Sequence, residues 1–289
     1  MPLLSATIDG GGWDRAGDAT AAWYMLAGQV LIHDDIVDAD RLRRGRPTLW
    51  VRYGIPEAIL TGDALVGAAF ELLTEVPSAI TAPAARMLAT ATRHIANGQI
   101  MDVTAQAPTP NALNAALDMT VAKTCSYLRC GACFGALHTQ SGPEQVAAMG
   151  QYGHHLGMIM QLRDDLADIW GDPTDSAELL GADLLKRKGS LPVVAALSST
   201  RPERDELARY YQSKHVPDRD ELRYLMGLLE ICGARVWCDL RIDEELAAAH
   251  DCLDRAAPHP QARQHLLDYA AFIARCSSVG AGRSQDQPR

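Results

Sequence analysis

The sequence lacks the features of membrane and secreted proteins. A membrane-spanning helix needs roughly 20 apolar residues, and the best candidate, Ala58 to Leu73, is interrupted by Asp63. The opening MPLLSATIDGGGWD contains no basic region followed by an apolar stretch, so it does not resemble a signal peptide. The cysteine count of 7 is odd and does not indicate a secreted disulfide framework. We therefore expect a cytoplasmic protein without a membrane span.

The sequence also lacks an excess of positive charge. Its 27 Lys and Arg residues against 36 Asp and Glu residues give a net charge of −9, and no basic cluster forms a track. Nucleic-acid-binding proteins normally show the opposite balance, so nucleic acid is excluded as the main partner. The hydrophobic share of 47% and the charged share of 22% are those of a globular chain.

Alternating runs of β-branched residues are almost absent, and apolar residues instead recur at three- and four-residue spacing. This pattern predicts a single all-α domain over residues 1–277, followed by a small, polar, disordered tail at 278–289. No linker and no internal repeat divides the domain. The roughly ten expected helices are 18–38, 56–75, 79–105, 110–138, 143–170, 191–199, 201–214, 218–229, 231–256 and 260–277.

Four helix starts carry capping signals. Thr109 precedes a proline, and the segments that begin at Ser141, Thr200 and Asp218 each place a glutamate three residues after a capping side chain. These patterns predict side-chain caps at all four positions.

The strongest local signal is an acidic motif at the end of the first long helix. Asp34 and Asp38 share a helix face, and Asp35 lies about a hundred degrees around the helix. Like charges at this spacing repel unless a cation lies between them. For one such cluster, a solvated acidic face is an equally good explanation. Val30 and Ile36, however, are among several apolar residues around the carboxylates, which favours a core helix.

A second aspartate triad recurs 130 residues later, also at the end of a long apolar helix. It comprises Asp164, Asp165 and Asp168. Two such triads facing each other across a helix bundle would form an oxygen-rich cage, which suits hard cations such as Mg²⁺. The sequence therefore predicts a paired metal site.

Basic segments follow both triads, from Asp40 to Thr48 and from Asp183 to Ser190, and Lys123 lies within a third apolar helix. Any one of these basic groups, taken alone, could simply keep a loop soluble. Together, in an acidic protein, they indicate a diphosphate held between metal ions and basic side chains.

These motifs resemble the trans-isoprenyl diphosphate synthases, or polyprenyl synthetases. The matching segments are DDIVDADRLRRGRPT, Ala58 to Leu65, Gly98-Gln99 with Asp102, Lys123-Thr124, QLRDDLAD and DLLKRKGSLPVVAAL. The resemblance covers nearly the whole chain. It implies the isoprenoid synthase fold, a helix bundle around a central prenyl cavity, and a homodimer.

The resemblance also implies roles for individual residues. The six aspartates of the two triads would be catalytic and would bind Mg²⁺, as three ions together with a bound diphosphate. The allylic prenyl diphosphate would be held by Arg43, Lys123, Thr124, Gln161 and Lys188. Arg44 would face isopentenyl diphosphate, the second substrate.

Departures from the family pattern concern the isopentenyl diphosphate site. The family's Gly-Lys-x-x-x-Arg-Pro segment is matched here only by Met1-Pro2, and Ala27 replaces the histidine seven residues before the first aspartate. Gln29 replaces an aromatic residue that often closes the tunnel, so we expect it either to bond a neighbouring helix or to line a reshaped pocket. Trp23 is either the cavity floor or a core residue.

Two reaction classes therefore remain open. Chain elongation with isopentenyl diphosphate is favoured by the family resemblance. The alternative is a terpene cyclase on the same fold, or prenyl transfer to another acceptor. A non-catalytic regulatory subunit would have no need of six metal-ligand aspartates.

Overall fold

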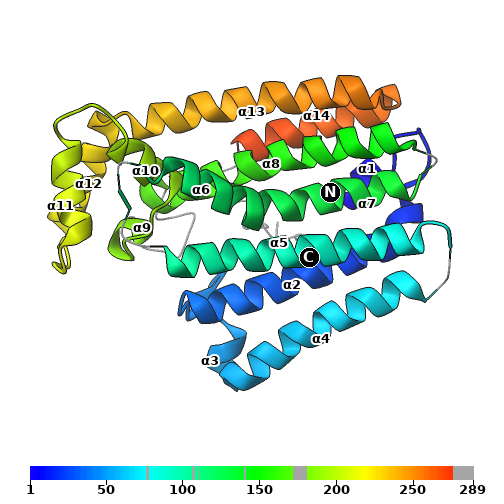
Figure 1. The fold of residues 1–289 in the computed structure, drawn as a ribbon, viewed down its shortest axis with the longest axis horizontal. Helices are drawn as coiled ribbons and strands as arrows, with labels where there is room; N and C mark the ends of the chain where they lie inside the picture. Colours follow the sequence, from blue (N-terminus) through cyan, green and yellow to red (C-terminus); the bar gives the residue numbers. More distant parts are fainter. Residues whose placement is uncertain (76–77, 106–107, 110, 140, 172–180, 276–289) are drawn as a thin grey trace, which may run out of the picture.

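The computed structural model describes residues 1–75, 78–105, 108–109, 111–139, 141–171 and 181–275, and helices dominate it (Figure 1). The short elements are α1 (Pro2–Ser5), η1 (Trp13–Ala16), β1 (Leu42–Arg43), β2 (Arg46–Pro47), α3 (Leu49–Tyr53) and α9 (Ala182–Leu185). The longer ones are α2 (Gly17–Val37), α4 (Ile55–Thr74), α5 (Thr81–Thr104), α6 (Leu113–Thr120), η2 (Val121–Cys125), α7 (Ser126–Leu137), α8 (Pro143–Trp170), α10 (Leu191–Leu197), α11 (Arg204–Gln212), α12 (Arg219–Ile231), α13 (Ala234–Ala256) and α14 (Pro260–Arg275).

All ten predicted helices are present, which confirms the all-α fold. The segment 110–138 is divided by η2, a π-helical turn between α6 and α7. The expected tail at 278–289 lies outside the described residues. Sequence reasoning missed the short elements of the 39–55 connection, where α3 and the β1–β2 hairpin form.

Only one of the four predicted caps forms. Asp218 accepts hydrogen bonds from the backbone N–H groups of residues 220 and 221, and Glu221 reciprocates. The predictions at Thr109, Ser141 and Thr200 are wrong, because the helices that follow them begin only at Leu113, Pro143 and Arg204. Thus α8 is preceded by Gly142 and α11 by Glu203, and neither helix has a side-chain cap.

The helices form layers around α7 and α8. In Figure 1, α13 and α14 lie above α8, while α5, α2 and α4 lie below α7. One large apolar core fills the space between these layers, and a smaller cluster joins α10, α11 and α12 at one end. Trp23 belongs to the large core: its ring stacks on Tyr127 with centroids 4.2 Å apart, and its Nε1–H donates to the Tyr127 carbonyl at 2.9 Å.

A buried charge network joins α8 to α13. The Glu245 carboxylate is almost completely buried, and it pairs with His155 at 2.6 Å and with Arg241 at 2.7 Å. Burial disfavours the charged form, but the His155 hydrogen bond and the Arg241 charge outweigh it and lower the pKa of Glu245. The carboxylate is therefore ionised at neutral pH in the folded protein.

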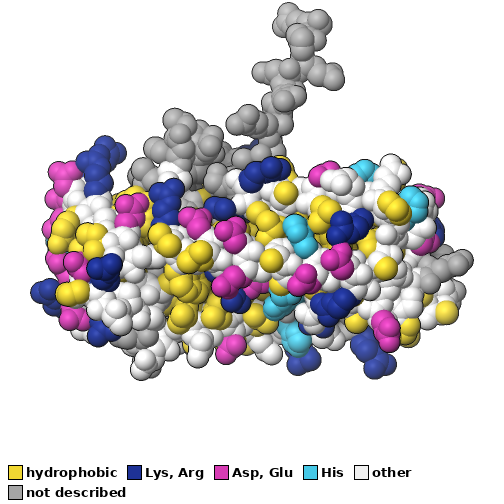
Figure 2. All heavy atoms as spheres, turned by 90° about the horizontal axis from the view of Figure 1, so that it is seen from above, with side chains coloured by type: hydrophobic (Ala, Val, Ile, Leu, Met, Phe, Trp, Pro, Cys, Tyr) yellow, Lys and Arg dark blue, Asp and Glu magenta, His cyan; other side chains and the backbone are white. Residues whose placement is uncertain are grey.

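The surface on the α13 side of the molecule carries charges of both signs, interspersed with apolar side chains (Figure 2). Among the side chains drawn in colour there, Lys and Arg are scattered and form no continuous track. Across the described residues, no helix combines the length and apolar character that crossing a bilayer requires.

Candidate active site

The first acidic motif is held at the C-terminal end of α2 by a tight chain reversal. Asp38 follows the last helical residue, and Ala39 adopts a left-handed φ of 56° that turns the chain out of the helix. The β1–β2 hairpin comes next, with Arg44 and Gly45 at its two-residue turn, both at positive φ. Such turns require this backbone geometry. Arg44 therefore lies at the tip of the hairpin.

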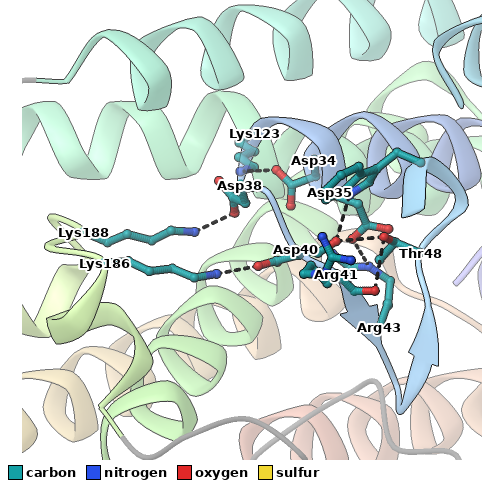
Figure 3. Close-up of polar contacts among 11 residues, drawn as sticks. Asp34, Asp35, Asp38, Asp40, Arg41, Arg43, Thr48, Lys123, Lys186 and Lys188 are labelled. Carbon is teal, nitrogen blue, oxygen red and sulfur yellow. Dashed lines mark hydrogen bonds and ion pairs between the residues drawn. The ribbon is translucent and has the colours of Figure 1, made fainter. Parts of the chain in front are cut away.

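Three aspartates near this end of α2 face three lysines (Figure 3). Lys123 Nζ lies 2.9 Å from Asp34, Lys188 Nζ lies 2.6 Å from Asp38, and Lys186 Nζ lies 2.5 Å from Asp40. We call these six residues the Asp–Lys cluster. Its members come from α2 and the turn after it, from η2, and from the segment that follows α9.

Neighbouring carboxylates hold the two more buried lysines of the cluster in their charged form. Lys123 also contacts Asp102 of α5 at 3.0 Å. Burial favours the neutral amine, but Asp34 and Asp102 outweigh it and raise the pKa of Lys123. Burial likewise opposes the charge of Lys188, and its hydrogen bond with Asp38 overcomes that effect and raises the pKa of Lys188.

The middle aspartate of each motif is turned into the protein. Asp35 is 4% exposed and accepts a hydrogen bond from Arg43 Nε at 2.6 Å. Burial nevertheless raises the pKa of Asp35, against the effect of Arg43. Asp165 is 5% exposed, and its two oxygens accept from Gln161 Nε2 at 2.7 Å and from the backbone N–H of residue 191 at 2.8 Å. Burial, followed by the charge of Asp183, raises the pKa of Asp165.

A hydrogen-bond relay orients this second motif. Thr124 Oγ1 donates to Gln161 Oε1 at 2.6 Å, and the amide group of Gln161 then donates to Asp165. The relay fixes which end of the Gln161 amide carries the oxygen. Asp164 and Asp168 are half-buried on α8 and have interactions of their own.

Two glycines bring η2 into backbone contact with its neighbours. A Cβ atom on Gly98 of α5 would lie 2.6 Å from the Lys123 nitrogen, and a Cβ atom on Gly157 of α8 would lie 2.5 Å from Cys125 Cα. Any larger residue would push the π-helical turn away. The positions of Lys123 and Thr124 therefore depend on these two glycines.

A cavity of about 390 Å³ begins beside Asp34 and runs between α2 and α5. Val30, Val37 and Ile95 are among its apolar walls, and Gln29 and His33 add polar groups. Gln29 Nε2 donates to His33 Nδ1 at 2.9 Å, on the same helix. Gln29 therefore bonds within its own helix and not, as the first alternative expected, to a neighbouring helix. It does lie in the cavity wall, and a role toward the substrate stays a prediction.

The donor chemistry of the site fits a hard divalent cation. Asp34 and Asp38 are largely buried, and they present carboxylate oxygens, the ligand type that Mg²⁺ prefers. Within the described residues, no group of three or more His, Cys, Asp and Glu side chains is gathered closely enough to hold a metal ion. Lysine ammonium groups balance the first motif's outer carboxylates, so a metal ion would compete with them for the same oxygens.

Several site residues carried no assigned role in the sequence reasoning. Asp102, which pairs with Lys123, belongs to a segment that matches the family, but the sequence predicts no role for it. The sequence predicts no pairing of Asp40 with Lys186, because 146 positions separate the two residues. Gly157 gave no signal, since a glycine in a helix shows its purpose only once the neighbouring backbone is placed.

The chain is similar to known proteins over most of its length. The family model described as polyprenyl synthetase matches residues 4–229. The chain is 34% identical over 261 residues to a geranylgeranyl diphosphate synthase of Mycobacterium tuberculosis, covering 90% of this chain and 75% of the relative. It is 32% identical over 246 residues to a (2E,6E)-farnesyl diphosphate synthase of Mycobacterium bovis, covering 84% and 68%.

Among solved structures, a polyprenyl synthetase from Streptomyces coelicolor superposes with a TM-score of 0.89 at 30% identity. That alignment covers 94% of this chain and 82% of the other.

Proposed function

Because the chain belongs to the polyprenyl synthetase family, we propose that it is a prenyl diphosphate synthase. In this reaction an allylic prenyl group is transferred to isopentenyl diphosphate, and diphosphate is released. One observation carries the proposal: Asp34 is the ion-pair partner of Lys123 and also part of the cavity wall. A charged site suited to diphosphate thus adjoins a largely apolar cavity suited to a prenyl chain.

Lysine and arginine side chains supply the positive charge for the leaving diphosphate. Lys123 and Lys188 lie beside Asp34 and Asp38, and Arg43 lies beside Asp35. Compact ammonium groups can exchange one oxygen partner for another, and the arginine fork suits phosphate oxygens. In our assignment these cations bind the allylic diphosphate, with Thr124 and Gln161 beside them, and Arg44 faces the second substrate from the hairpin tip.

We assign metal binding to the outer aspartates of the two motifs, namely Asp34, Asp38, Asp164 and Asp168. Bound Mg²⁺, in the proposed number of three ions, would act as a Lewis acid that stabilises the charge on the departing diphosphate. Our assignment departs from the six-aspartate expectation at Asp35 and Asp165, because both already accept hydrogen bonds from the protein. Their part is to orient Arg43 and Gln161.

The cavity protects the reactive chain once the allylic C–O bond breaks. Its electron pair leaves with diphosphate, and the allylic carbon becomes cationic. Apolar walls at Val30 and Ile95 limit the access of water to that cation. The double bond of isopentenyl diphosphate then attacks the cation, a new C–C bond forms, and the released diphosphate accepts the proton that is lost.

The two curated relatives described above are named as diphosphate synthases, which favours elongation. Ala27 is the observation behind a second candidate function, because the family's histidine toward isopentenyl diphosphate is missing there. An enzyme that cyclises its own substrate, or that uses another acceptor, would not need that group. No comparison supports the cyclase.

We also propose a homodimer. Exposed apolar side chains lie at the start of α4, at Ile55, Ile59 and Leu60, and at the end of α5, at Ile100 and Val103. The last two also line the cavity. A second copy of the chain packed against these two helix ends would cover their apolar side chains and shield the open side of the cavity. Light scattering coupled to size-exclusion chromatography should give twice the chain mass of 31.3 kDa, and a monomer at micromolar concentration would contradict the proposal.

Turnover with Mg²⁺ and defined substrates tests the reaction. Purified protein is incubated with C10, C15 and C20 allylic diphosphates, each with and without isopentenyl diphosphate, and products are identified by mass spectrometry. Longer diphosphates that appear only with isopentenyl diphosphate would support elongation. Hydrocarbons or alcohols formed without it would establish the cyclase, and a lack of turnover in both arms would contradict both.

Two substitutions test the metal assignment. Asp34→Asn and Asp164→Asn should each reduce turnover by at least about a hundredfold, since each removes a charged oxygen ligand. Asp251→Asn is the matched control, because Asp251 is an exposed aspartate on α13. Full activity in both site variants would refute the assignment.

A further inference from the structure

Lysine is rare in this chain, and its placement is uneven. Among the 27 basic residues only Lys123, Lys186, Lys188 and Lys214 are lysines, and the rest are arginines. The first three all belong to the Asp–Lys cluster. Lys123 and Lys188 have a clear use in the proposed function as diphosphate ligands. Lys186 has none, because its partner Asp40 lies outside the acidic triad.

The Asp40 side of this pair is rigidly held. The Asp40 backbone carbonyl accepts hydrogen bonds from Thr48 Oγ1 and Trp50 Nε1, both at 2.8 Å, and its N–H donates to the Asp35 carbonyl at 2.9 Å. These contacts fix the turn that follows α2. The Asp40 carboxylate is thus presented from a backbone with little freedom to move.

The segment that carries Lys186 is held in place by the contacts of the next residue, Arg187. Arg187 adopts a left-handed φ of 52°, donates to the His215 carbonyl, and lies with its guanidinium carbon 4.6 Å from the centre of the Tyr210 ring. Arg187 is thereby anchored to α11 and to the segment after it. Lys186 and Lys188, on either side of it, extend alongside each other toward the end of α2 (Figure 3).

We propose that the Asp40–Lys186 ion pair is a permanent strap that positions Lys188 for the diphosphate, whereas Lys123 and Lys188 exchange partners during binding. This inference rests on the proposed function. When diphosphate binds, Lys123 and Lys188 pass to phosphate oxygens, and the outer carboxylates Asp34 and Asp38 would hold the metal ions. Lys186 stays paired with Asp40. The segment that carries Lys188 therefore stays at the end of α2 while the ion pair between Lys188 and Asp38 breaks.

Charge reversal tests the strap. Lys186→Met and Asp40→Asn should each raise KM for the allylic diphosphate about twofold to fivefold, the range expected for a partly exposed ion pair. The kcat should stay within about twofold, because Lys186 is not a diphosphate ligand. The double variant Asp40→Lys with Lys186→Asp should restore KM. Lys214→Met, an exposed lysine outside the cluster, is the control.

A spectroscopic measurement separates the lysines without relying on turnover. Reductive ¹³C-methylation preserves the lysine charge and labels the four lysines and the terminal amine, and single Lys→Arg variants assign each signal. On titration with Mg²⁺ and inorganic diphosphate, the Lys123 and Lys188 signals should shift, while those of Lys186 and Lys214 should not. A Lys186 shift as large as that of Lys188 would overturn the strap.

The strap and the proposed function fail differently. If the natural protein elongates prenyl chains but Lys186→Met leaves KM unchanged, or the reversed pair does not restore it, the strap is wrong and the function stands. If the protein turns over no prenyl diphosphate but the lysine signals respond as expected, the strap stands as a diphosphate-site device and the proposed reaction is wrong.

Discussion

Replacement of Gly157 by alanine tests whether close backbone packing positions η2. The added Cβ would lie 2.5 Å from Cys125 Cα, where ordinary contact begins at 3.4 Å, so α8 and η2 must separate by about 0.9 Å. Overpacking of this kind costs about 1–3 kcal/mol. Alanine returns up to about 1 kcal/mol through its better helix propensity.

The net expectation for Gly157→Ala is a loss of up to about 2 kcal/mol. That loss corresponds to a fall in Tm of up to about 3 °C for a chain of this size, measured by circular dichroism. Because η2 carries Lys123 and Thr124, a displacement of nearly 1 Å should lower kcat by about a hundredfold. Turnover is measured with the substrate pair that the natural protein uses.

Gly227→Ala is the matched control. Gly227 also lies within a helix, α12, but a Cβ atom there would meet nothing within 4 Å. We expect this variant to gain up to about 1 kcal/mol and to keep full activity. If Gly157→Ala is as stable and as active as Gly227→Ala, the packing argument is wrong.

Three further predictions concern the core, the buried charge network and the cavity. Trp23→Phe removes the hydrogen bond to the Tyr127 carbonyl and should cost about 1–2 kcal/mol in urea unfolding; an unchanged midpoint would contradict it. Glu245→Gln should cost about 1–3 kcal/mol at pH 7. Since the pKa of Glu245 is lowered on folding, its contribution is present above the unfolded pKa and is lost as the pH falls, so the difference from the natural protein should narrow below about pH 4.5; a constant difference would refute it. A growing prenyl chain that reaches Gln29 buries the amide group of this side chain, which costs about 1–3 kcal/mol. Gln29→Leu removes that cost and should therefore shift the ratio of longer to shorter products about tenfold toward the longer. An unaltered product pattern would show that growing chains do not reach Gln29.

Local sequence determined the helices and both acidic motifs. The period of the apolar residues placed each long helix to within a few residues, because that period reflects which face of a helix is buried. The spacing of Asp34 and Asp38 put both on one face for the same reason. The capping patterns were less informative, because among these segments only the one at Asp218 forms a capping box. Similar patterns at Ser141 and Thr200 precede helices whose N-caps are Gly142 and Glu203.

Tertiary structure decided which charges meet. Lys123 reaches Asp34 across 89 positions and Lys188 reaches Asp38 across 150. No local pattern encodes such distances, because they depend on how whole helices pack. Packing also decided that Asp35 and Asp165 are buried more deeply than the other aspartates of their motifs, and that Gly157 must be glycine. The sequence by itself named the chemical groups of the site; only the fold could assign their partners, since ion pairs and backbone contacts form between segments that packing of the core brings together.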